Sequence, residues 1–246
     1  MSSVTKAFQI LETVADAGER GLPFARIVES TAIPKASAHR LLRELVEISV
    51  LSFDPDTRHY RGGMMLARLG ANASADYDLR RVARPHLEAL QKETGHVATL
   101  GVRNDDEGVY VDKIEPDDFS IRLHSEVGKA FPLHCTGMGK VLLAHASKDD
   151  VRRLSKRQLK AFTKHTITDS KALREELDRV RAKGYALDRE EITRGLMCVA
   201  APIYDAHGEI AGAMSCTFQS YINADRGIDA EIDAVTRHAK AASGLI

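Results

Sequence analysis

The sequence of 246 residues predicts an α+β protein, with an N-terminal winged helix-turn-helix and a larger domain in which helices flank an antiparallel sheet. Three patterns support this prediction. Two helical stripes separated by a turn lie within the first 45 residues, and a short hairpin pattern follows them. Two longer hairpin patterns then alternate with helices beyond residue 96.

Residues 33–45 are predicted to form a short helix with two chemically different faces. Apolar residues recur at i, i+3, i+4 and i+7 as Ala38, Leu41, Leu42 and Leu45. Pro34 suits the first helical position, where its missing N–H costs nothing. The opposite face is rich in hydrogen-bond donors: Lys35, Ser37, His39, Arg40 and Arg43. Such a face suits the major groove of DNA, where Arg reads guanine and Lys and Ser hold phosphates, although an ordinary solvated helix has the same pattern.

The surrounding segments favour the DNA-binding interpretation. A helical stripe at 4–17 precedes a glycine break, a short segment at 23–28 and a turn at 31–33, which together give a helix-turn-helix. Residues 50–53 and 58–61 flank the turn sequence Asp-Pro-Asp-Thr and are predicted to form a β-hairpin wing. Its returning strand offers Arg58 and Arg61 to a phosphate backbone.

Acidic and basic residues are equal in number in this region but are concentrated in different segments. Residues 1–62 contain eight Lys or Arg and eight Asp or Glu, so the domain is formally neutral. Three of the acids, Glu12, Asp16 and Glu19, lie on the first helix, while the predicted recognition segment and the returning wing strand are cationic. We therefore expect specific binding to DNA with modest non-specific affinity.

Beyond the wing, residues 64–77 form a predicted linker helix whose exposed Leu and Met side chains suit burial against a partner chain. A helix is expected to start at Pro85 and to end near Gly95. Strands are predicted at 97–103, 109–115, 197–204 and 209–217, and helices at roughly 137–147, 170–183 and 225–242.

Composition excludes several classes of protein. No apolar run approaches the ~20 residues of a membrane span, and the N-terminus has no signal-peptide core. Three cysteines, never spaced as CxxC, suggest neither a disulfide framework nor a structural zinc site. We expect a cytoplasmic protein that binds no metal and no cofactor.

Three blocks of sequence resemble the IclR family of bacterial transcriptional regulators: residues 33–45, residues 128–144, and residues 183–203. The resemblance implies a winged-helix domain (1–62), a linker helix (63–80) and a GAF-like effector-binding and oligomerisation domain (81–246). It further implies a homodimer or homotetramer on a palindromic operator in double-stranded DNA. It also implies repression of a catabolic operon and a small acidic or aromatic effector. Ala36 departs from the family, which often has a hydroxyl residue there.

The resemblance also implies an effector pocket between the sheet and the start of the helix at Gly137. Gly137, Met138 and Gly139 would present backbone N–H groups to an anion. The two hairpin strands alternate so that Cys198, Ser215 and Thr217 can share one face. The remaining matched positions are apolar, except for one acid: Leu123, Phe131, Leu196 and Asp188. Small core residues would show the same pattern, and Glu190 and Glu191 are expected in a solvated turn.

Other functions have weaker support. The sequence Gly137-Met138-Gly139-Lys140 fails as a phosphate-binding loop because Val141 stands where Ser or Thr is needed. A Cys/His hydrolase using Cys135 or Cys198 with His134 remains an alternative. His124, His134 and Asp188 specify no metal geometry. A DNA-binding protein whose C-terminal domain serves only oligomerisation is a third possibility.

Overall fold

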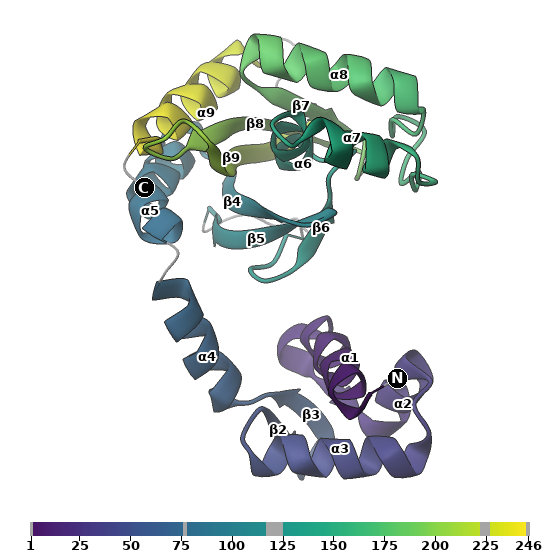
Figure 1. Ribbon diagram of the computed structural model, residues 1–246. Helices are drawn as coiled ribbons and strands as arrows, with labels where there is room; N and C mark the ends of the chain where they lie inside the picture. The colour runs from purple at the N-terminus through teal and green to yellow at the C-terminus, as the bar shows by residue number, and fades with distance from the viewer. Residues whose placement is uncertain (1, 76–77, 117–124, 222–226, 245–246) are drawn as a thin grey trace. The chain divides into compact units, whose positions relative to one another are not determined.

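The structure is a computed structural model that describes residues 2–75, 78–116, 125–221 and 227–244 (Figure 1). The chain divides into two compact units, Met1–Tyr77 and Asp78–Ile246, each with its own hydrophobic core. The finer boundaries at residues 62 and 80 stay a prediction.

The N-terminal unit combines helices with a small antiparallel sheet of strand order β1-β3-β2. Its elements are α1 (Ser3–Ala15), the 3₁₀ turn η1 (Gly18–Arg20), β1 (Leu22–Pro23), α2 (Phe24–Thr31), α3 (Lys35–Glu47), β2 (Leu51–Asp54), β3 (His59–Gly62) and α4 (Met64–Ala75). The β2–β3 hairpin is the predicted wing, whereas the two-residue strand β1 was not predicted. Residues 76 and 77 of the expected linker helix lie outside the described residues.

The helix-turn-helix forms because apolar faces of three helices meet. Ile10, Ile27 and Leu42, from α1, α2 and α3 respectively, are fully buried together. Ala32 ends α2 in the left-handed conformation (φ 53°), which turns the chain towards α3. The predicted stripe of α3 is buried as expected, but Pro34 is the N-cap residue rather than the first residue of the helix.

The C-terminal unit is built on a six-stranded antiparallel sheet of order β6-β5-β4-β9-β8-β7. Its strands are β4 (Val97–Asn104), β5 (Glu107–Ile114), β6 (Ala130–Pro132), β7 (Ala186–Arg189), β8 (Leu196–Tyr204) and β9 (Ile210–Gln219). Its helices are α5 (Asp78–Thr94), α6 (Gly137–Ala144), α7 (Lys148–Ser155), α8 (Ser170–Lys183) and α9 (Asp229–Ala242).

Helices cover both faces of this sheet (Figure 1). On one face α5 and α9 pack on residues such as Leu100, Val199 and Cys216. On the other face α6 and α8 pack on Ala186 and Ala200. Because side chains alternate along a strand, residues two apart from Ala186 and Ala200 also point to the α6 side.

Five elements of the C-terminal unit differ from the prediction. The helix expected to start at Pro85 starts at Asp78, because Leu79 and Ala83 are buried on the sheet and this burial outweighs the one hydrogen bond that an internal proline removes. The helix at Gly137 ends at Ala144, earlier than expected. The short strands β6 and β7 and the helix α7 carry too few periodic residues to be predicted.

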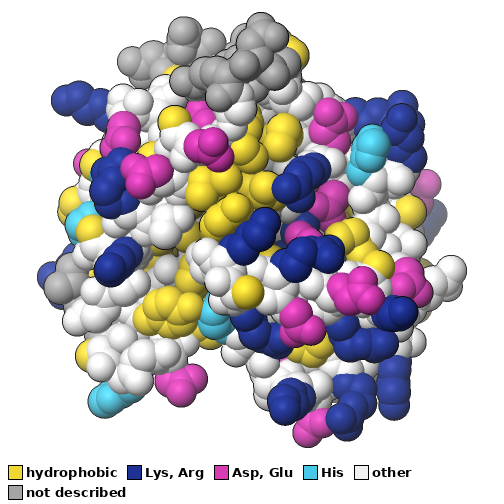
Figure 2. Space-filling model, turned by 90° about the horizontal axis from the view of Figure 1, so that it is seen from above, with side chains coloured by type: hydrophobic (Ala, Val, Ile, Leu, Met, Phe, Trp, Pro, Cys, Tyr) yellow, Lys and Arg dark blue, Asp and Glu magenta, His cyan; other side chains and the backbone are white. Residues whose placement is uncertain are grey.

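The surface of the molecule mixes both signs of charge. Figure 2 shows acidic side chains interspersed among Lys and Arg. On α7 and α8 this mixing takes the form of ion pairs three residues apart, such as Arg152–Asp149 and Arg181–Asp178. Within the described segments, no helix has both the length and the apolar character needed to cross a bilayer.

Candidate functional site

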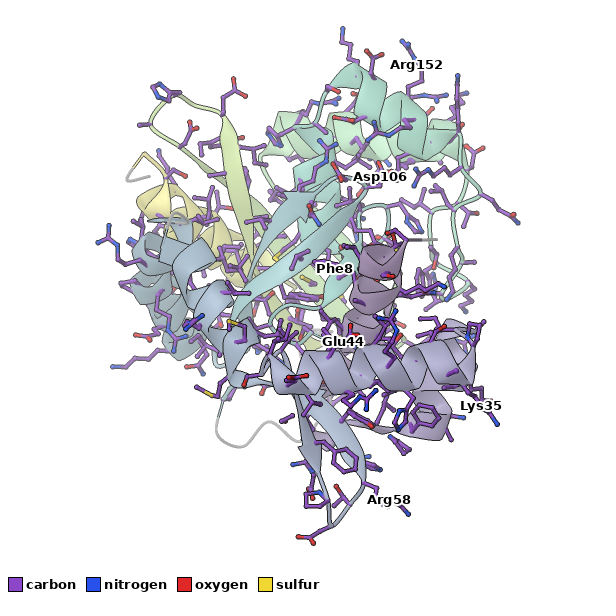
Figure 3. The ribbon with its side chains drawn as sticks, turned by 60° about the horizontal axis from the view of Figure 1, so that its bottom comes forward. Phe8, Lys35, Glu44, Arg58, Asp106 and Arg152 are labelled. Carbon is purple, nitrogen blue, oxygen red and sulfur yellow. The ribbon has the colours of Figure 1, made fainter. Side chains whose placement is uncertain are left out.

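The donor-rich face of α3 is exposed to solvent. Lys35, His39, Arg40 and Arg43 are exposed and Ser37 is partly exposed, while the apolar stripe fixes the helix from below. Figure 3 shows Lys35 and Glu44 towards opposite ends of this helix. The helix therefore presents its donors as a row that a groove could receive.

Two of these side chains are already engaged within the protein. The Arg40 guanidinium donates to Glu44 Oε1 at 2.8 Å, in an exposed pair one helical turn apart. The His39 ring packs edge-on against Phe24 with 5.9 Å between ring centroids. Exposed pairs of this kind contribute only about 0.3–0.5 kcal/mol, so Arg40 can leave Glu44 at low cost.

The tip of the wing is shaped by Asp54. Its carboxylate accepts hydrogen bonds from the Asp56 and Thr57 amides at 3.0 and 3.2 Å. The Thr57 amide in particular holds the pKa of Asp54 below its ordinary value. Arg58 follows with φ 57° and is exposed at the tip of the wing (Figure 3), whereas Arg61 pairs with Asp54 at 3.5 Å. Arg58 is thus the freer of the two predicted phosphate contacts.

The C-terminal unit contains a cavity of about 670 Å³ on the α6 side of its sheet. Its walls come from the sheet, from the start of α6 and from the loops at 162–163 and 192–194. The described lining residues are Thr99, Tyr110, Ser125, Ala130, Pro132, Thr136, Gly137, Met138, Phe162, Thr163, Asp188, Ile192, Thr193, Arg194, Leu196, Met197, Cys198, Ser215 and Thr217.

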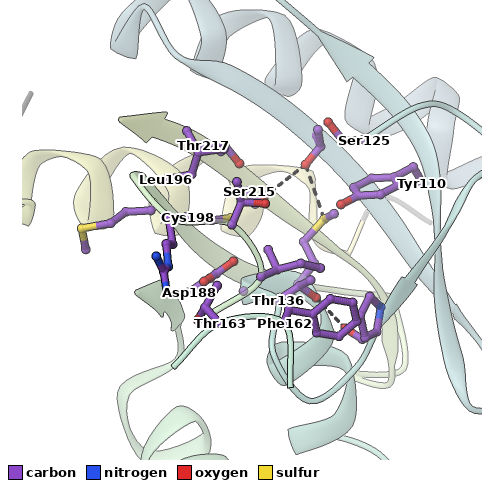
Figure 4. A pocket seen from close by; sticks show the side chains of 18 of the residues that line it. Tyr110, Ser125, Thr136, Phe162, Thr163, Asp188, Leu196, Cys198, Ser215 and Thr217 are labelled. Atoms are coloured by element: carbon purple, nitrogen blue, oxygen red, sulfur yellow. Dashed lines mark hydrogen bonds between the residues drawn. The ribbon is translucent and has the colours of Figure 1, made fainter. Parts of the chain in front are cut away.

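Strand register explains why the polar residues meet in this cavity. Asp188 lies opposite Cys198, which lies opposite Thr217, so one residue from each of β7, β8 and β9 forms a row across the sheet. Thr99 lies opposite Ser215, and their hydroxyl oxygens are 2.7 Å apart. In Figure 4 the side chains of Asp188, Cys198, Ser215 and Thr217 lie on one side of the cavity, with Tyr110 and Phe162 across from them.

The first turn of α6 is prepared by Thr136. Its hydroxyl accepts the Gly139 amide at 3.0 Å and donates to Pro132 O at 2.8 Å. The amides of Gly137 and Met138 have no hydrogen-bond partner among the described residues. Those two donors therefore remain for a ligand, and they lie at the positive end of the helix dipole.

Three predicted pocket residues are not among the described lining residues. Phe131 is 2% exposed, and its ring packs on Tyr110 with 4.6 Å between centroids, so it supports the cavity wall from behind. A Cβ on Gly139 would meet Pro132 O and Thr136 Oγ1 at 2.5 Å, so this glycine permits close packing instead of lining the pocket. Leu123 lies outside the described residues.

A buried charge cluster lies beside the cavity, and the sequence did not predict it. Lys140 is fully buried, and its ammonium donates to Glu191 Oε1 at 2.5 Å and to Glu176 Oε1 at 3.2 Å. The expected solvated turn at Glu191 is therefore wrong: this residue is 4% exposed. Burial raises the pKa of Glu191, and the Lys140 charge opposes that rise.

Asp188 connects this cluster to the cavity. Its Oδ1 accepts the Glu191 amide at 2.7 Å. Burial raises the pKa of Asp188 to about 7, and the nearby Glu191 charge adds to the rise while the Glu191 amide opposes it. Near neutral pH this carboxyl is therefore partly protonated, and it can both donate and accept hydrogen bonds.

The lining residues on the loops and on strands β4 and β5 were not predicted from the sequence. Thr99 and Tyr110 lie on predicted strands, so the alternation of the strands could have identified Thr99. No periodic signal marks Phe162, Thr163, Thr193 or Arg194. Their place depends on hydrogen bonds such as Thr163 Oγ1 to Glu190 O at 2.7 Å, which join segments far apart in the chain.

Comparison with known proteins agrees with this architecture. The family model described as bacterial transcriptional regulator IclR C-terminal matches residues 71–244, and the IclR helix-turn-helix domain matches residues 3–55. The chain is 35% identical over 239 residues to the transcriptional regulator BhcR of Paracoccus denitrificans, covering 97% of this chain and 85% of that protein. It is 32% identical over 203 residues to the transcriptional repressor YiaJ of Escherichia coli, covering 81% and 72%.

A solved structure shows the same similarity in three dimensions. The IclR transcriptional regulator from Alicyclobacillus acidocaldarius superposes with a TM-score of 0.86 at 29% identity, over 98% of this chain and 97% of that one. Both matched domain models together span nearly the whole sequence, in the order that the two structural units have. This chain belongs to the IclR family of bacterial transcriptional regulators.

Proposed function

We propose that the protein represses a catabolic operon by holding a palindromic DNA operator through α3 and the wing, and that a small acidic metabolite in the C-terminal cavity releases it. One observation carries this proposal: a structural unit with an exposed, donor-rich helix is joined to a separate unit with a cavity lined by both polar and apolar side chains. A ligand-dependent coupling of only ~1–3 kcal/mol would change operator occupancy substantially.

The effector's acidic group would occupy the start of α6. The amides of Gly137 and Met138 offer donors to a carboxylate there, and the exposed Arg194 adds a positive charge at the wall of the cavity. A charged Asp188 would repel the effector's carboxylate, and this repulsion disappears when Asp188 is protonated. The site is therefore suited to an anion at its α6 end and to hydrogen-bonding groups along the sheet.

The proposal is tested by an electrophoretic mobility shift with the DNA upstream of the protein's own gene, with and without a panel of small carboxylic acids. We expect specific retardation that at least one acid reverses. Retardation that no acid changes would favour a C-terminal unit that serves only oligomerisation. Absence of specific retardation at low salt with several promoters would refute the regulatory function.

Replacing Arg40 with Ala should weaken operator binding by ~1–3 kcal/mol and relax preference at one base pair, because Arg reads guanine through two hydrogen bonds. Arg58→Ala should instead weaken all sequences alike. Fluorescence anisotropy on operators with single base changes would measure both.

The matched control for this prediction is Arg26→Ala. Arg26 is an exposed arginine that, like Arg40, pairs with a glutamate of its own helix at 2.8 Å, but it lies on α2 and not on the predicted recognition helix, so its loss should leave base preference unchanged. If Arg40→Ala weakened every sequence equally, Arg40 would contact phosphate only.

We further propose that the protein is a homodimer or homotetramer, with apolar residues of the N-terminal unit at the dimer contact. Phe8 is 61% exposed on α1, and Met64 and Leu69 are exposed on α4. Phe8→Glu should shift the molecular mass measured by light scattering towards the monomer. Phe8→Leu, which keeps the apolar contact, should not. An unchanged mass for Phe8→Glu would place the dimer contact elsewhere.

The hydrolase alternative has little support from the environment of the cysteines. Burial raises the pKa of Cys135, and burial raises the pKa of Cys198 to about 11, so both thiols stay protonated at neutral pH. His134 Nε2 lies 3.0 Å from Lys160 O. Cys198 Sγ donates to Val199 O at 3.7 Å and also interacts with the Thr217 and Ser215 hydroxyls, neither of which is a base. A protonated thiol without an adjacent base is a poor nucleophile.

A further inference from the structure

Side-chain hydroxyls recur among the residues that line the cavity. Among the nineteen described residues that line it, eight carry a side-chain hydroxyl. Pockets for small molecules are usually lined mainly by apolar side chains with a few polar groups. Apolar side chains line this cavity too, so its hydroxyls mark the few positions to which a ligand has to direct its own polar groups.

Part of this hydrogen-bonding capacity is unused among the described residues. Ser125 is 8% exposed, and its Oγ is buried with no hydrogen-bond partner among the described residues. The Tyr110 hydroxyl also lines the cavity, and burial keeps its pKa raised, so it remains a donor at neutral pH. Because a polar group without a partner is costly once water leaves, an apolar ligand would leave these groups unsatisfied.

The remaining polar groups are spaced along a line across the sheet. Asp188, Cys198 and Thr217 occupy neighbouring positions on β7, β8 and β9. Adjacent strands lie roughly 4.8 Å apart, so the row spans roughly 10 Å at right angles to the strands. The bonded pair of Thr99 and Ser215 lies beside this row, and Figure 4 shows Ser215, Thr217 and Asp188 along the same side of the cavity.

A linear ligand with a hydroxyl on each successive carbon fits this row. Its hydroxyls could donate to Asp188 and form hydrogen bonds with Thr217 and Ser215. Ser125 and Tyr110 could form hydrogen bonds with hydroxyls on the opposite side of the chain. An aromatic ring carries polar groups only at its edge and would cover the row with carbon.

We propose that the effector is a polyhydroxylated carboxylic acid of about five or six carbons, an aldonate-like chain. The inference rests on the proposed function, because the carboxylate is assigned to the start of α6 and the hydroxylated chain to the row on the sheet. Each hydroxyl contact of the protein should contribute roughly three- to tenfold in affinity.

The test is isothermal titration calorimetry of the full chain with the five- and six-carbon aldonates, with hexanoate, and with 4-hydroxybenzoate. At least one aldonate should bind tenfold or more tightly than both other acids. Thr217→Val and Ser215→Ala should each weaken that aldonate roughly three- to tenfold. Thr168→Val, an exposed threonine that does not line the cavity, should leave the affinity unchanged.

The outcomes separate this inference from the proposed function. Equal or tighter binding of hexanoate or 4-hydroxybenzoate would overturn the inference and leave the function standing. Unchanged aldonate affinity in Thr217→Val and Ser215→Ala would also overturn it, provided that thermal unfolding shows both variants folded. Binding of none of these acids would count against both proposals.

Discussion

Replacing Lys140 with Met is expected to lower the free energy of unfolding of the C-terminal unit by about 3–5 kcal/mol. The ammonium of Lys140 is fully buried and is shared between Glu191 at 2.5 Å and Glu176 at 3.2 Å. Met keeps most of the side-chain volume of Lys140, so the loss of stability comes from removal of the charge. Glu191 is then left buried without its cation, whereas Glu176 keeps Arg179 at 2.9 Å. Urea unfolding followed by circular dichroism would measure the change.

The double variant Lys140→Met/Glu191→Met is the matched control for this prediction. Removing both charges should recover much of the lost stability, since a buried pair replaced by apolar residues of similar volume is often neutral. A single variant Lys140→Met with wild-type stability would show that the cluster is solvated in solution. Equal losses in the single and double variants would show that packing, not charge, holds α6 in place.

Deprotonation of Asp188 should destabilise the protein as pH rises from about 4 to about 7. Burial raises its pKa from 3.8 to about 7, so the folded state binds this proton more tightly than the unfolded state does. Stability that comes from the bound proton is complete below the unfolded pKa and is lost as pH rises through the folded pKa. The full loss is on the order of 4 kcal/mol.

The difference between wild type and Asp188→Asn isolates this titration from the other groups. Asn keeps an oxygen for the Glu191 amide and carries no charge, so we expect similar stabilities near pH 4 and a more stable variant at pH 8. His86 and His134, whose pKa values are lowered, titrate in the same way in both proteins. Their contributions therefore cancel in the difference between the two stabilities. Parallel stability curves from pH 4 to 8 would show that Asp188 titrates normally.

Local periodicity was sufficient to predict the elements that carry the DNA-facing and sheet residues. The apolar stripe of α3 required only 3.6-residue spacing, and it fixed which side of the helix Lys35 and Arg40 would occupy. Period-two alternation placed Cys198, Ser215 and Thr217 on one face, and the structure brings them to one cavity. Both inferences use neighbours within a single element.

Contacts between distant segments could not be predicted in the same way. Lys140 and Glu191 are 51 residues apart, and their pairing depends on how α6 crosses the sheet. Phe131 has the size and polarity of a pocket residue, but its ring packs on Tyr110 of the neighbouring strand and is not among the described lining residues. Pro85 alone predicts the start of a helix, yet burial of Leu79 extends α5 by two turns.

The pairing of Arg40 with Glu44 has a consequence for how the protein searches a chromosome. Each phosphate that a protein cation neutralises releases counterions, so added salt lowers the affinity. The logarithm of the binding constant falls against the logarithm of the salt concentration with a slope of about 0.9 per phosphate contact. Eight acids balance eight basic residues in the first 62 positions, and one of those acids holds a central arginine of α3. We expect a shallow salt slope on random DNA and therefore short residence there. Most molecules would then remain free to find the operator.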